Sequence, residues 1–391
     1  MKSLNDMAEA KLEALEKLRL RRSLAVSDRL PDAAVERDGK RLVSFSCNDY
    51  LNLSHDPRVI EAAVLATQRY GVGAGASRLV TGNHPLFAEL EMRLARLKGT
   101  EDCIVFGSGY LANTGILPVL AGSTDLILAD ELSHACLLSG ARLSGAKTLT
   151  FRHNDMAHLK ELLDAHRGAH PHCLVVTDGV FSMDGDMPPL PELAALCAQH
   201  DAWLLTDDAH GVGVVGGGRG SSFAFGEKVP EKVHVPLQMG TLSKAIGGYG
   251  GYLCASRPVI DLMRTRARTF VFSTGLPPAS VAAAIAALDI IAGDPKLCAR
   301  PVELARLFCW QMGLPAPQSP IVPVIVGEAA RALRLSAALA EAGFLVTAIR
   351  PPTVPRGTAR LRFTFTARHE PEDVERLAET LQRLMSVEEV A

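Results

Sequence analysis

Residues 240–248, GTLSKAIGG, place a lysine in a glycine-rich turn directly after the short, largely apolar run 235–239. Upstream, the apolar run 202–205 ends in the acidic stretch 206–211, TDDAHG. Short runs that are continuously apolar are typical of strands buried on both faces. In open α/β sheets, ligands bind at the carboxyl ends of the strands. The two stretches therefore predict a parallel sheet that carries an aspartate and a lysine at its ligand-binding edge.

The chain around these stretches continues to alternate short apolar runs with helical patterns. We expect strands at 103–106, 126–129, 148–151, 174–177, 202–205, 235–239 and 252–255. Helices are expected between them at 111–120, 133–143, 157–165 and 190–200. This alternation predicts an α/β fold, with a mostly parallel central sheet flanked by helices on both faces.

The two ends of the chain depart from this pattern. Residues 4–24 are rich in Ala, Leu, Glu, Lys and Arg, which predicts an amphipathic helix. Further helices are expected at 57–70, 85–98, 280–291, 329–342 and 371–385, and further strands at 321–326, 344–349 and the alternating 359–366. We divide the chain into an N-terminal helical arm (1–45), a large α/β domain (46–290) and a small C-terminal α+β domain (291–391).

The composition is that of an ordinary globular protein. The 391 residues are 48% hydrophobic and 21% charged, with a net charge of −2. That charge gives no electrostatic reason to expect a nucleic acid or an anionic membrane as a partner. The eight cysteines lack C-x-x-C spacing, so we expect no metal cluster and no disulfide framework, but reduced thiols in a cytoplasmic protein. The most apolar run, 280–293, is too short to cross a bilayer.

The residues at the predicted strand ends suit one cofactor. Lys244 can hold pyridoxal 5'-phosphate (PLP) as a Schiff base, and Asp207 can pair with the pyridinium nitrogen, which makes the ring an electron sink. His210 can reach the phenolic oxygen of the ring, and His134, at a helix start, can stack on it. Each histidine has a structural alternative, at a strand end or a helix start. The adjacent Asp208 is expected only to cap or to form a turn.

Hydroxyl and backbone groups are available for the phosphate of such a cofactor. Ser108, Gly109 and Tyr110 form a glycine turn that opens a helix, where backbone N–H groups suit an anion. Thr241 is a further candidate hydroxyl. The pair Ser273–Thr274 is another, although a plain loop role explains this pair equally well.

Other positions carry less specific signals. Ser182 follows a buried strand and could contact the cofactor or form a turn. Arg350 ends a strand, and its guanidinium could bind a carboxylate with two hydrogen bonds, but an exposed arginine is the simpler interpretation. The fragment Gly107-x-Gly109 lacks the third glycine and the ribose-binding acid of a dinucleotide site, which disfavours a nicotinamide-dependent oxidoreductase.

Four motifs in combination make the chain resemble the α-oxoamine synthases, PLP enzymes of the aspartate-aminotransferase fold type. They are GAGASRLVTG at 73–82, VFSMDGD at 180–186, DDAHG at 207–211 and TLSK at 241–244. The resemblance extends from residue 47 to about residue 369. It implies a decarboxylative condensation of an amino acid with an acyl thioester, in a homodimer with active sites at the subunit interface.

The resemblance also implies roles for individual residues. Four residues would be catalytic: Lys244, His134, Asp207 and His210. Further cofactor contacts would come from Ser108, Gly109, Tyr110, Ser182, Thr241 and, across the homodimer interface, Ser273 and Thr274.

The substrates follow from the stretch 347–362, TAIRPPTVPRGTARLR. Within the family it looks most like members that join L-alanine to pimeloyl-CoA, or to a pimeloyl carrier protein, to make 8-amino-7-oxononanoate for biotin. Arg350 would then bind the amino-acid carboxylate, and Asn48 and Arg21 would lie near the acyl substrate. Sister reactions such as glycine with acetyl-CoA remain open, because the shape of the acyl pocket is not visible in the sequence.

Overall fold

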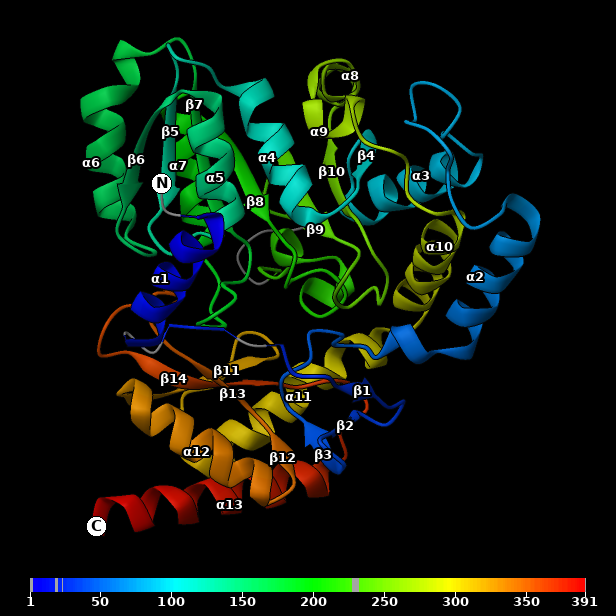
Figure 1. Ribbon diagram of the computed structural model, residues 1–391. Coiled ribbons are helices and arrows are strands. Elements are labelled where there is room, and N and C mark those ends of the chain that lie inside the picture. The colour runs from blue at the N-terminus through cyan, green and yellow to red at the C-terminus, as the bar shows by residue number, and fades with distance from the viewer. Residues whose placement is uncertain (1–2, 18–19, 23, 227–231, 391) are drawn as a thin grey trace.

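A seven-stranded sheet forms the centre of the larger part of the molecule (Figure 1). The structure is a computed structural model that describes residues 3–17, 20–22, 24–226 and 232–390. In the order of the sheet, the strands are β4 (Asp102–Phe106), β10 (Gly251–Ala255), β9 (Leu237–Thr241), β8 (Trp203–Asp207), β7 (Cys173–Asp178), β5 (Leu126–Asp130) and β6 (Lys147–Phe151). Only β10 runs antiparallel to its neighbours among these strands, so the predicted mostly parallel sheet is confirmed.

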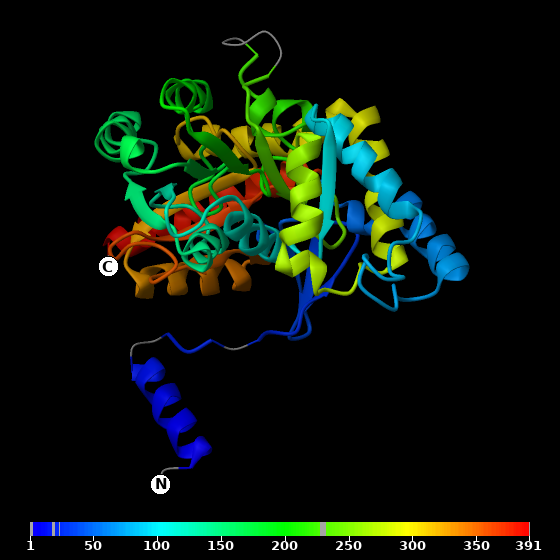
Figure 2. The same ribbon diagram turned by 90° about the horizontal axis from the view of Figure 1, so that it is seen from above.

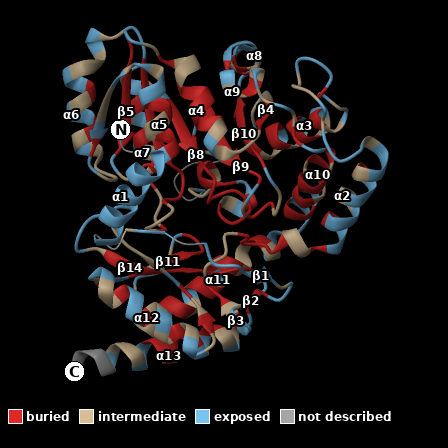
Figure 3. Ribbon diagram, viewed as in Figure 1, coloured by how far each residue is buried: buried red, intermediate tan, exposed pale blue. Residues whose placement is uncertain are grey.

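Helices cover both faces of this sheet, and alternate strand residues point to opposite faces. In β4, Ile104 and Phe106 pack in a core with α4 (Gly109–Leu120), α5 (Ala135–Ser144), α8 (Arg257–Arg266) and α9 (Arg268–Val271). Cys103 and Val105 of the same strand face α3 (Leu86–Lys98) and α10 (Pro278–Gly293). The latter face is also covered by α6 (Met156–His166) and α7 (Leu190–Gln199), which pack on β5 and β7. Figure 3 shows the resulting buried centre.

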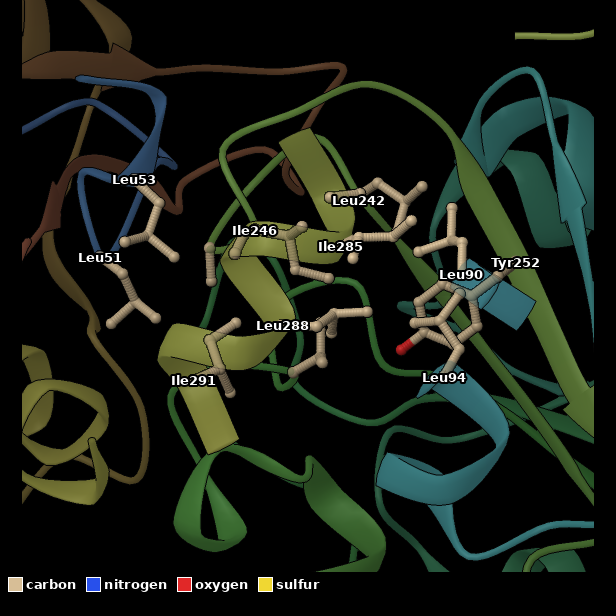
Figure 4. Close-up of a cluster of buried hydrophobic side chains, with 14 of the residues drawn as sticks. Leu51, Leu53, Leu90, Leu94, Leu242, Ile246, Tyr252, Ile285, Leu288 and Ile291 are labelled. Carbon is tan, nitrogen blue, oxygen red and sulfur yellow. The ribbon is translucent and has the colours of Figure 1, made fainter. Parts of the chain in front are cut away.

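Helix α10 is buried along most of its length and links the sheet to α2 (Pro57–Tyr70) and α3. Figure 4 shows its residues Ile285 and Leu288 lying among Leu90, Leu94 and Tyr252. Among the described residues, no helix combines the length and the apolar composition needed to cross a membrane. Short 3-10 helices lie at Leu53–His55, Arg167–Ala169, Gly216–Gly218 and Ser221–Phe223.

The C-terminal part is built on a three-stranded antiparallel sheet. Its strands are β11 (Ile321–Gly327), β14 (Ala359–Thr364) and β13 (Thr347–Ile349), covered by α11 (Pro295–Met312), α12 (Ala329–Glu341) and α13 (Pro371–Val390). The single strand expected at 344–349 is wrong, because the chain passes from β12 (Phe344–Leu345) in one sheet to β13 in another. The alternating strand expected at 359–366 is observed as β14, and all six of its residues are buried.

The N-terminal part is less helical than expected. Helix α1 (Leu4–Lys17) ends before the predicted residue 24, and strands β1 (Asp28–Arg29), β2 (Ala34–Arg37) and β3 (Lys40–Ser44) follow it. These strands extend from β12, in the order β1-β2-β3-β12. No side chain of α1, whose residues are all described, is buried, and most of the helix projects away from the rest of the molecule (Figure 2). The expected arm over residues 1–45 is therefore a short helix followed by a strand-rich segment.

Candidate active site

Charged side chains gather where neighbouring strands of the large sheet end. Asp130, Asp178 and Asp207 are the last residues of β5, β7 and β8. Asp178 and Asp207 lie opposite each other in the parallel register of β7 and β8. Lys244 follows three residues after the end of β9, the next strand in the sheet. The predicted lysine and aspartate thus lie at one edge of the sheet.

The two consecutive aspartates have different surroundings. Asp207 accepts a hydrogen bond from Asn113 Nδ2 at 2.7 Å and one from the backbone N–H of Ala209 at 3.0 Å. Asp208 forms a fully buried ion pair with Lys98, whose Nζ lies 2.6 Å from the carboxylate. Asp208 therefore neutralises a buried lysine, which is a more specific structural role than the cap or turn that its sequence position indicated.

A chain of polar contacts leads from Lys244 to strand β14 of the C-terminal part. Lys244 Nζ lies 2.7 Å from His210 Nε2, and His210 Nδ1 lies 2.6 Å from the Tyr50 hydroxyl. That hydroxyl is 3.4 Å from Asn48 Oδ1, which also accepts from both Nη atoms of Arg362 at 3.3 Å. Residues that are far apart in the sequence therefore converge on the lysine.

The electrostatics of this chain favour neutral partners around the lysine. Burial lowers the pKa of Lys244, against the opposing charges of Asp207 and Asp178. Burial, with the nearby charge of Lys244, lowers the pKa of His210 well below its usual value. Burial raises the pKa of Tyr50 to about 12, so its phenol keeps its proton at neutral pH. A half-buried amine with a lowered pKa is a group suited to nucleophilic and base chemistry.

His134 is placed as the sequence predicted, at the start of α5. Its Nδ1 accepts from the backbone N–H of Cys136 at 3.3 Å, and its own backbone N–H donates to Asp178 Oδ1 at 3.1 Å. The ring keeps an exposed face, but burial of its remainder lowers the pKa of His134, partly opposed by the charge of Asp207. The result is a neutral flat ring near Asp207 and Lys244 with an accessible face.

The start of α4 forms a cradle beside Thr241. Ser108 Oγ accepts a backbone N–H of the first helical turn at 3.2 Å, and Thr241 Oγ1 lies 2.8 Å from Ser243 Oγ. A Cβ on Gly251 would lie 2.6 Å from the Gly109 nitrogen, and one on Gly109 would lie 3.2 Å from Met239 Cε. The two glycines thus keep the backbone at this helix start accessible. Helix N–H groups and adjacent hydroxyls are a donor set that fits a phosphate.

Other predicted residues lie outside this cluster or only at its border. Tyr110 is exposed in the first turn of α4, and the carbonyl oxygen of Ser182 accepts from Arg362 Nε. Thr274 forms an isolated bridge with Ser77, and among the described residues no hydrogen bond joins Ser273 or Thr274 to Lys244. Within one chain, Ser273 and Thr274 therefore belong to a loop that contacts Ser77 and lies apart from the cluster around Lys244.

Arg350 and Arg21 lie together at a different place. They line a groove of about 750 Å³, with Leu15, Leu20, Arg22 and residues 348–353 as the other lining residues. The groove lies between the segment after α1 and the turn after β13. The structure thus groups two of the predicted substrate residues, while Asn48 belongs to the chain of contacts that ends at Lys244.

Sequence reasoning missed four residues that the structure brings to the site, namely Tyr50, Asn113, Asp178 and Arg362. Asn113 offered a signal, since it is a buried amide within the otherwise apolar helix α4. Arg362 offered a weaker one, as a charged residue in the middle of a strand. The other two sit in segments whose local pattern does not single them out.

Comparison with known proteins agrees with this geometry. The model of the family described as aminotransferase class I and II matches residues 40–381. A putative 8-amino-7-oxononanoate synthase of Parvibaculum lavamentivorans is 66% identical over 379 residues, which cover 97% of this chain and 96% of the relative. An 8-amino-7-oxononanoate synthase of Methylocella silvestris is 65% identical, over 90% of this chain and 99% of the relative. A serine palmitoyltransferase variant from S. paucimobilis, with a bound PLP–myriocin aldimine, superposes with a TM-score of 0.90 over 100% of both chains, at 29% identity.

Proposed function

The chain belongs to the aminotransferase class I and II family, and from this premise we propose that it is a PLP-dependent acyltransferase of biotin biosynthesis. It condenses L-alanine with a pimeloyl thioester and releases carbon dioxide and the thiol, giving 8-amino-7-oxononanoate. One observation carries the chemistry: Lys244, with its lowered pKa, lies beside Asp207 at the carboxyl edge of the sheet. The choice of product rests on relatives at 65–66% identity, since the serine palmitoyltransferase is far less similar in sequence.

The residues present fit PLP. Lys244 would bind its aldehyde carbon, Asp207 its pyridinium nitrogen and His134 one face of its ring. The start of α4, with Thr241, would hold its phosphate. Bound PLP supplies an electron sink that stabilises negative charge on the α-carbon of the amino acid.

Lys244 is also the group that we assign to proton transfer. Its lowered pKa favours the unprotonated amine, which can accept a proton from the α-carbon. His210 lies 2.7 Å away and is itself neutral, so it orients the amine without adding a competing charge. The hydroxyl of Tyr50 fixes the other side of the His210 ring.

For the amino-acid carboxylate we propose Arg362 in place of Arg350. Arg362 is buried, and both of its Nη atoms donate to Asn48 Oδ1, which joins the chain of contacts that leads to Lys244. A guanidinium can bind a carboxylate with two parallel hydrogen bonds. We assign the groove lined by Arg350 and Arg21 to the anionic acyl donor, whether CoA or a carrier protein.

We further propose a homodimer in the cytoplasm. Ser273 and Thr274 lie in a loop apart from the cluster around Lys244, as expected of residues that serve the site of a second subunit. Three apolar side chains of α2, Ile60, Val64 and Leu65, are exposed and offer a surface for such a contact. The cytoplasmic location rests on the eight free cysteines, since reducing compartments favour unpaired thiols.

The test is an absorbance titration of the purified protein with three amino acids. Bound PLP gives a visible band, and we expect L-alanine, but not glycine or L-serine, to shift it. Product formation from L-alanine and a pimeloyl thioester then checks the acyl donor. A protein that cannot be reconstituted with PLP would refute the proposal, whereas a response to glycine alone would point to a sister reaction with acetyl-CoA.

A further inference from the structure

His153 joins three segments at the carboxyl edge of the large sheet. It follows β6, and its Nδ1 lies 3.1 Å from Asp130 Oδ1, at the end of β5, while its Nε2 lies 2.8 Å from Asp186 Oδ2, in the segment after β7. Ionised carboxylates accept hydrogen bonds only, so both ring nitrogens act as donors and the ring is an imidazolium. Burial opposes this charge, but the two carboxylates raise the pKa of His153 to about 10. The bridge is therefore charged at neutral pH.

The bridge holds the loop 181–186 against the large domain. Asn154 Nδ2 donates to the same Asp186 carboxylate at 2.9 Å. The ring of Phe181 packs edge-on against the His153 ring, with 4.4 Å between their centres. The backbone N–H of Phe181 donates to Asp186 O at 2.9 Å, which closes the loop on itself. Phe181 and Asp186, the two ends of the loop, are thus both held by contacts with residues 153–154.

The same loop is bound from the other side by arginines of β14. Arg362 Nε donates to the carbonyl oxygen of Ser182, and Arg360 Nη1 donates to that of Met183 at 3.2 Å. The remaining nitrogens of Arg362 point to Asn48 Oδ1 at 3.3 Å. Because the guanidinium of Arg362 is hydrogen-bonded to a backbone carbonyl of the loop, a displacement of the loop would displace the guanidinium.

We propose that His153 is a positioning residue for the amino-acid site. By bridging Asp130 and Asp186 it fixes the loop 181–186, and the loop in turn aims Arg362 at the carboxylate of the amino-acid substrate. In this role His153 acts through the loop and Arg362. The inference rests on the proposed function, in which Arg362 binds that carboxylate.

The variant His153→Phe removes both donors but keeps a ring against Phe181. In the holoenzyme we expect the dissociation constant of L-alanine, from the absorbance titration, to rise about tenfold or more, as small misplacements of a binding group commonly cost. The KM for the acyl thioester should change less than twofold. His158→Phe is the matched control: among the described residues, its side chain accepts a hydrogen bond from the backbone N–H of Arg152, and it lies on α6. This control should bind L-alanine like the wild type.

A second measurement does not depend on turnover. The amide of Gly185 donates to Phe181 O at 2.8 Å, so its hydrogen exchange in the holoenzyme reports on the loop. We expect faster exchange there in His153→Phe and, to a smaller degree, in Asp186→Asn, which keeps an acceptor but loses the charge. Should His153→Phe fail to fold, Asp186→Asn carries both measurements.

Two results would overturn the inference. One is a folded His153→Phe or Asp186→Asn enzyme with unchanged affinity for L-alanine. The other is an equal rise in the dissociation constant of L-alanine and in the KM for the acyl thioester, which would indicate a general loss of structure. A wild-type enzyme that responds to glycine or L-serine instead would contradict the proposed substrate, and the same variants would then test His153 with that amino acid.

Discussion

Two lysine–aspartate groups lie at the end of strand β8 and differ in almost every physical respect. Lys98 and Asp208 are completely buried and joined at 2.6 Å, and Lys98 Nζ also donates to the backbone oxygen of Arg219 at 2.7 Å. Lys244 is only half-buried and contacts neutral His210, while the adjacent Asp207 is held by an amide. In the first group every charge is matched inside the protein. In the second, no direct ion pair joins Lys244 to a carboxylate within the described part of the chain, which leaves its amine available for chemistry.

This difference matters because the residue types are the same. Asp207 and Asp208 are neighbours in the sequence, and each works with a lysine that is distant in the chain. A paired buried lysine stabilises the fold only as long as its partner is present. A lysine whose pKa is lowered by burial is instead prepared to react. The following predictions test this division between a structural and a reactive group.

The largest effect is expected for Lys244→Ala. Removal of the nucleophile should lower the turnover number on the order of 10⁴-fold or more and abolish the visible band of a lysine-bound cofactor. The free energy of unfolding of the cofactor-free protein should not decrease, because the change removes an amine that burial destabilises. Activity assays and urea unfolding measure the two quantities. A variant that retained a tenth of the activity would end the assignment of Lys244.

For Lys98→Met we expect a loss of stability with little change in activity. The change leaves Asp208 buried without its counter-ion and should lower the free energy of unfolding by about 3–5 kcal/mol. The turnover number of the molecules that remain folded should stay within about twofold, because Lys98 lies outside the site. Adding Asp208→Asn removes the second charge and should restore part of the stability. A loss of activity without a loss of stability would contradict the comparison.

The third prediction concerns the pH dependence of stability and rests on His369, which lies between β14 and α13. His369 is fully buried, stacks on Phe45 and lies 3.1 Å through Nε2 from Ser44 O. Burial lowers the pKa of His369 to about 4, below the value near 6.5 of an unfolded chain. The neutral ring therefore contributes stability above pH 6.5, and this is lost as the pH falls toward 4. The expected loss over that interval is about 3 kcal/mol.

Urea unfolding between pH 7 and pH 4 checks this expectation. His369→Gln should weaken the protein at pH 7, but its stability should fall less steeply toward pH 4 than that of the wild type. The contribution of His153 to stability depends on pH in the opposite direction, since the pKa of His153 is raised to about 10. The stability from its ion pairs is fully present below pH 6.5 and is lost as the pH rises from 6.5 through 10. Parallel acid profiles for His369→Gln and the wild type would show that His369 is not responsible.

Much of the fold could be predicted because its signals are local. The run 174–177 lies inside β7 (Cys173–Asp178), and the helix predicted at 57–70 has the observed bounds of α2, which Asp56 caps. Strands buried on both faces must be continuously apolar, so the central sheet is visible in the sequence. The division of residues 344–349 into β12 and β13 could not be predicted from the sequence, because it depends on which sheet each half joins.

The site was predictable to the extent that its residues follow strands. Lys244, Asp207 and His134 all stand where a strand or a helix boundary could be read. Tyr50 and Arg362 reach the same place from parts of the chain that are more than 100 residues away on either side. Contacts of this kind leave no periodic pattern in the sequence, since they depend on how segments that are distant in the chain pack together.

The smallest effect is expected for Tyr50→Phe, which sharpens the comparison at the reactive lysine itself. The change removes the hydroxyl that lies 2.6 Å from His210 Nδ1 but leaves the ring in place. A hydrogen bond between neutral groups contributes about 0.5–1.5 kcal/mol, so kcat should fall at most about tenfold. Because His210 would be held less firmly against Lys244, the pH at which kcat rises should shift, whereas the stability should change little. If kcat and the pH profile are both identical to the wild type, the Tyr50 hydroxyl is not needed to hold His210 against Lys244. The reactive group would then consist of Lys244, His210 and Asp207 alone.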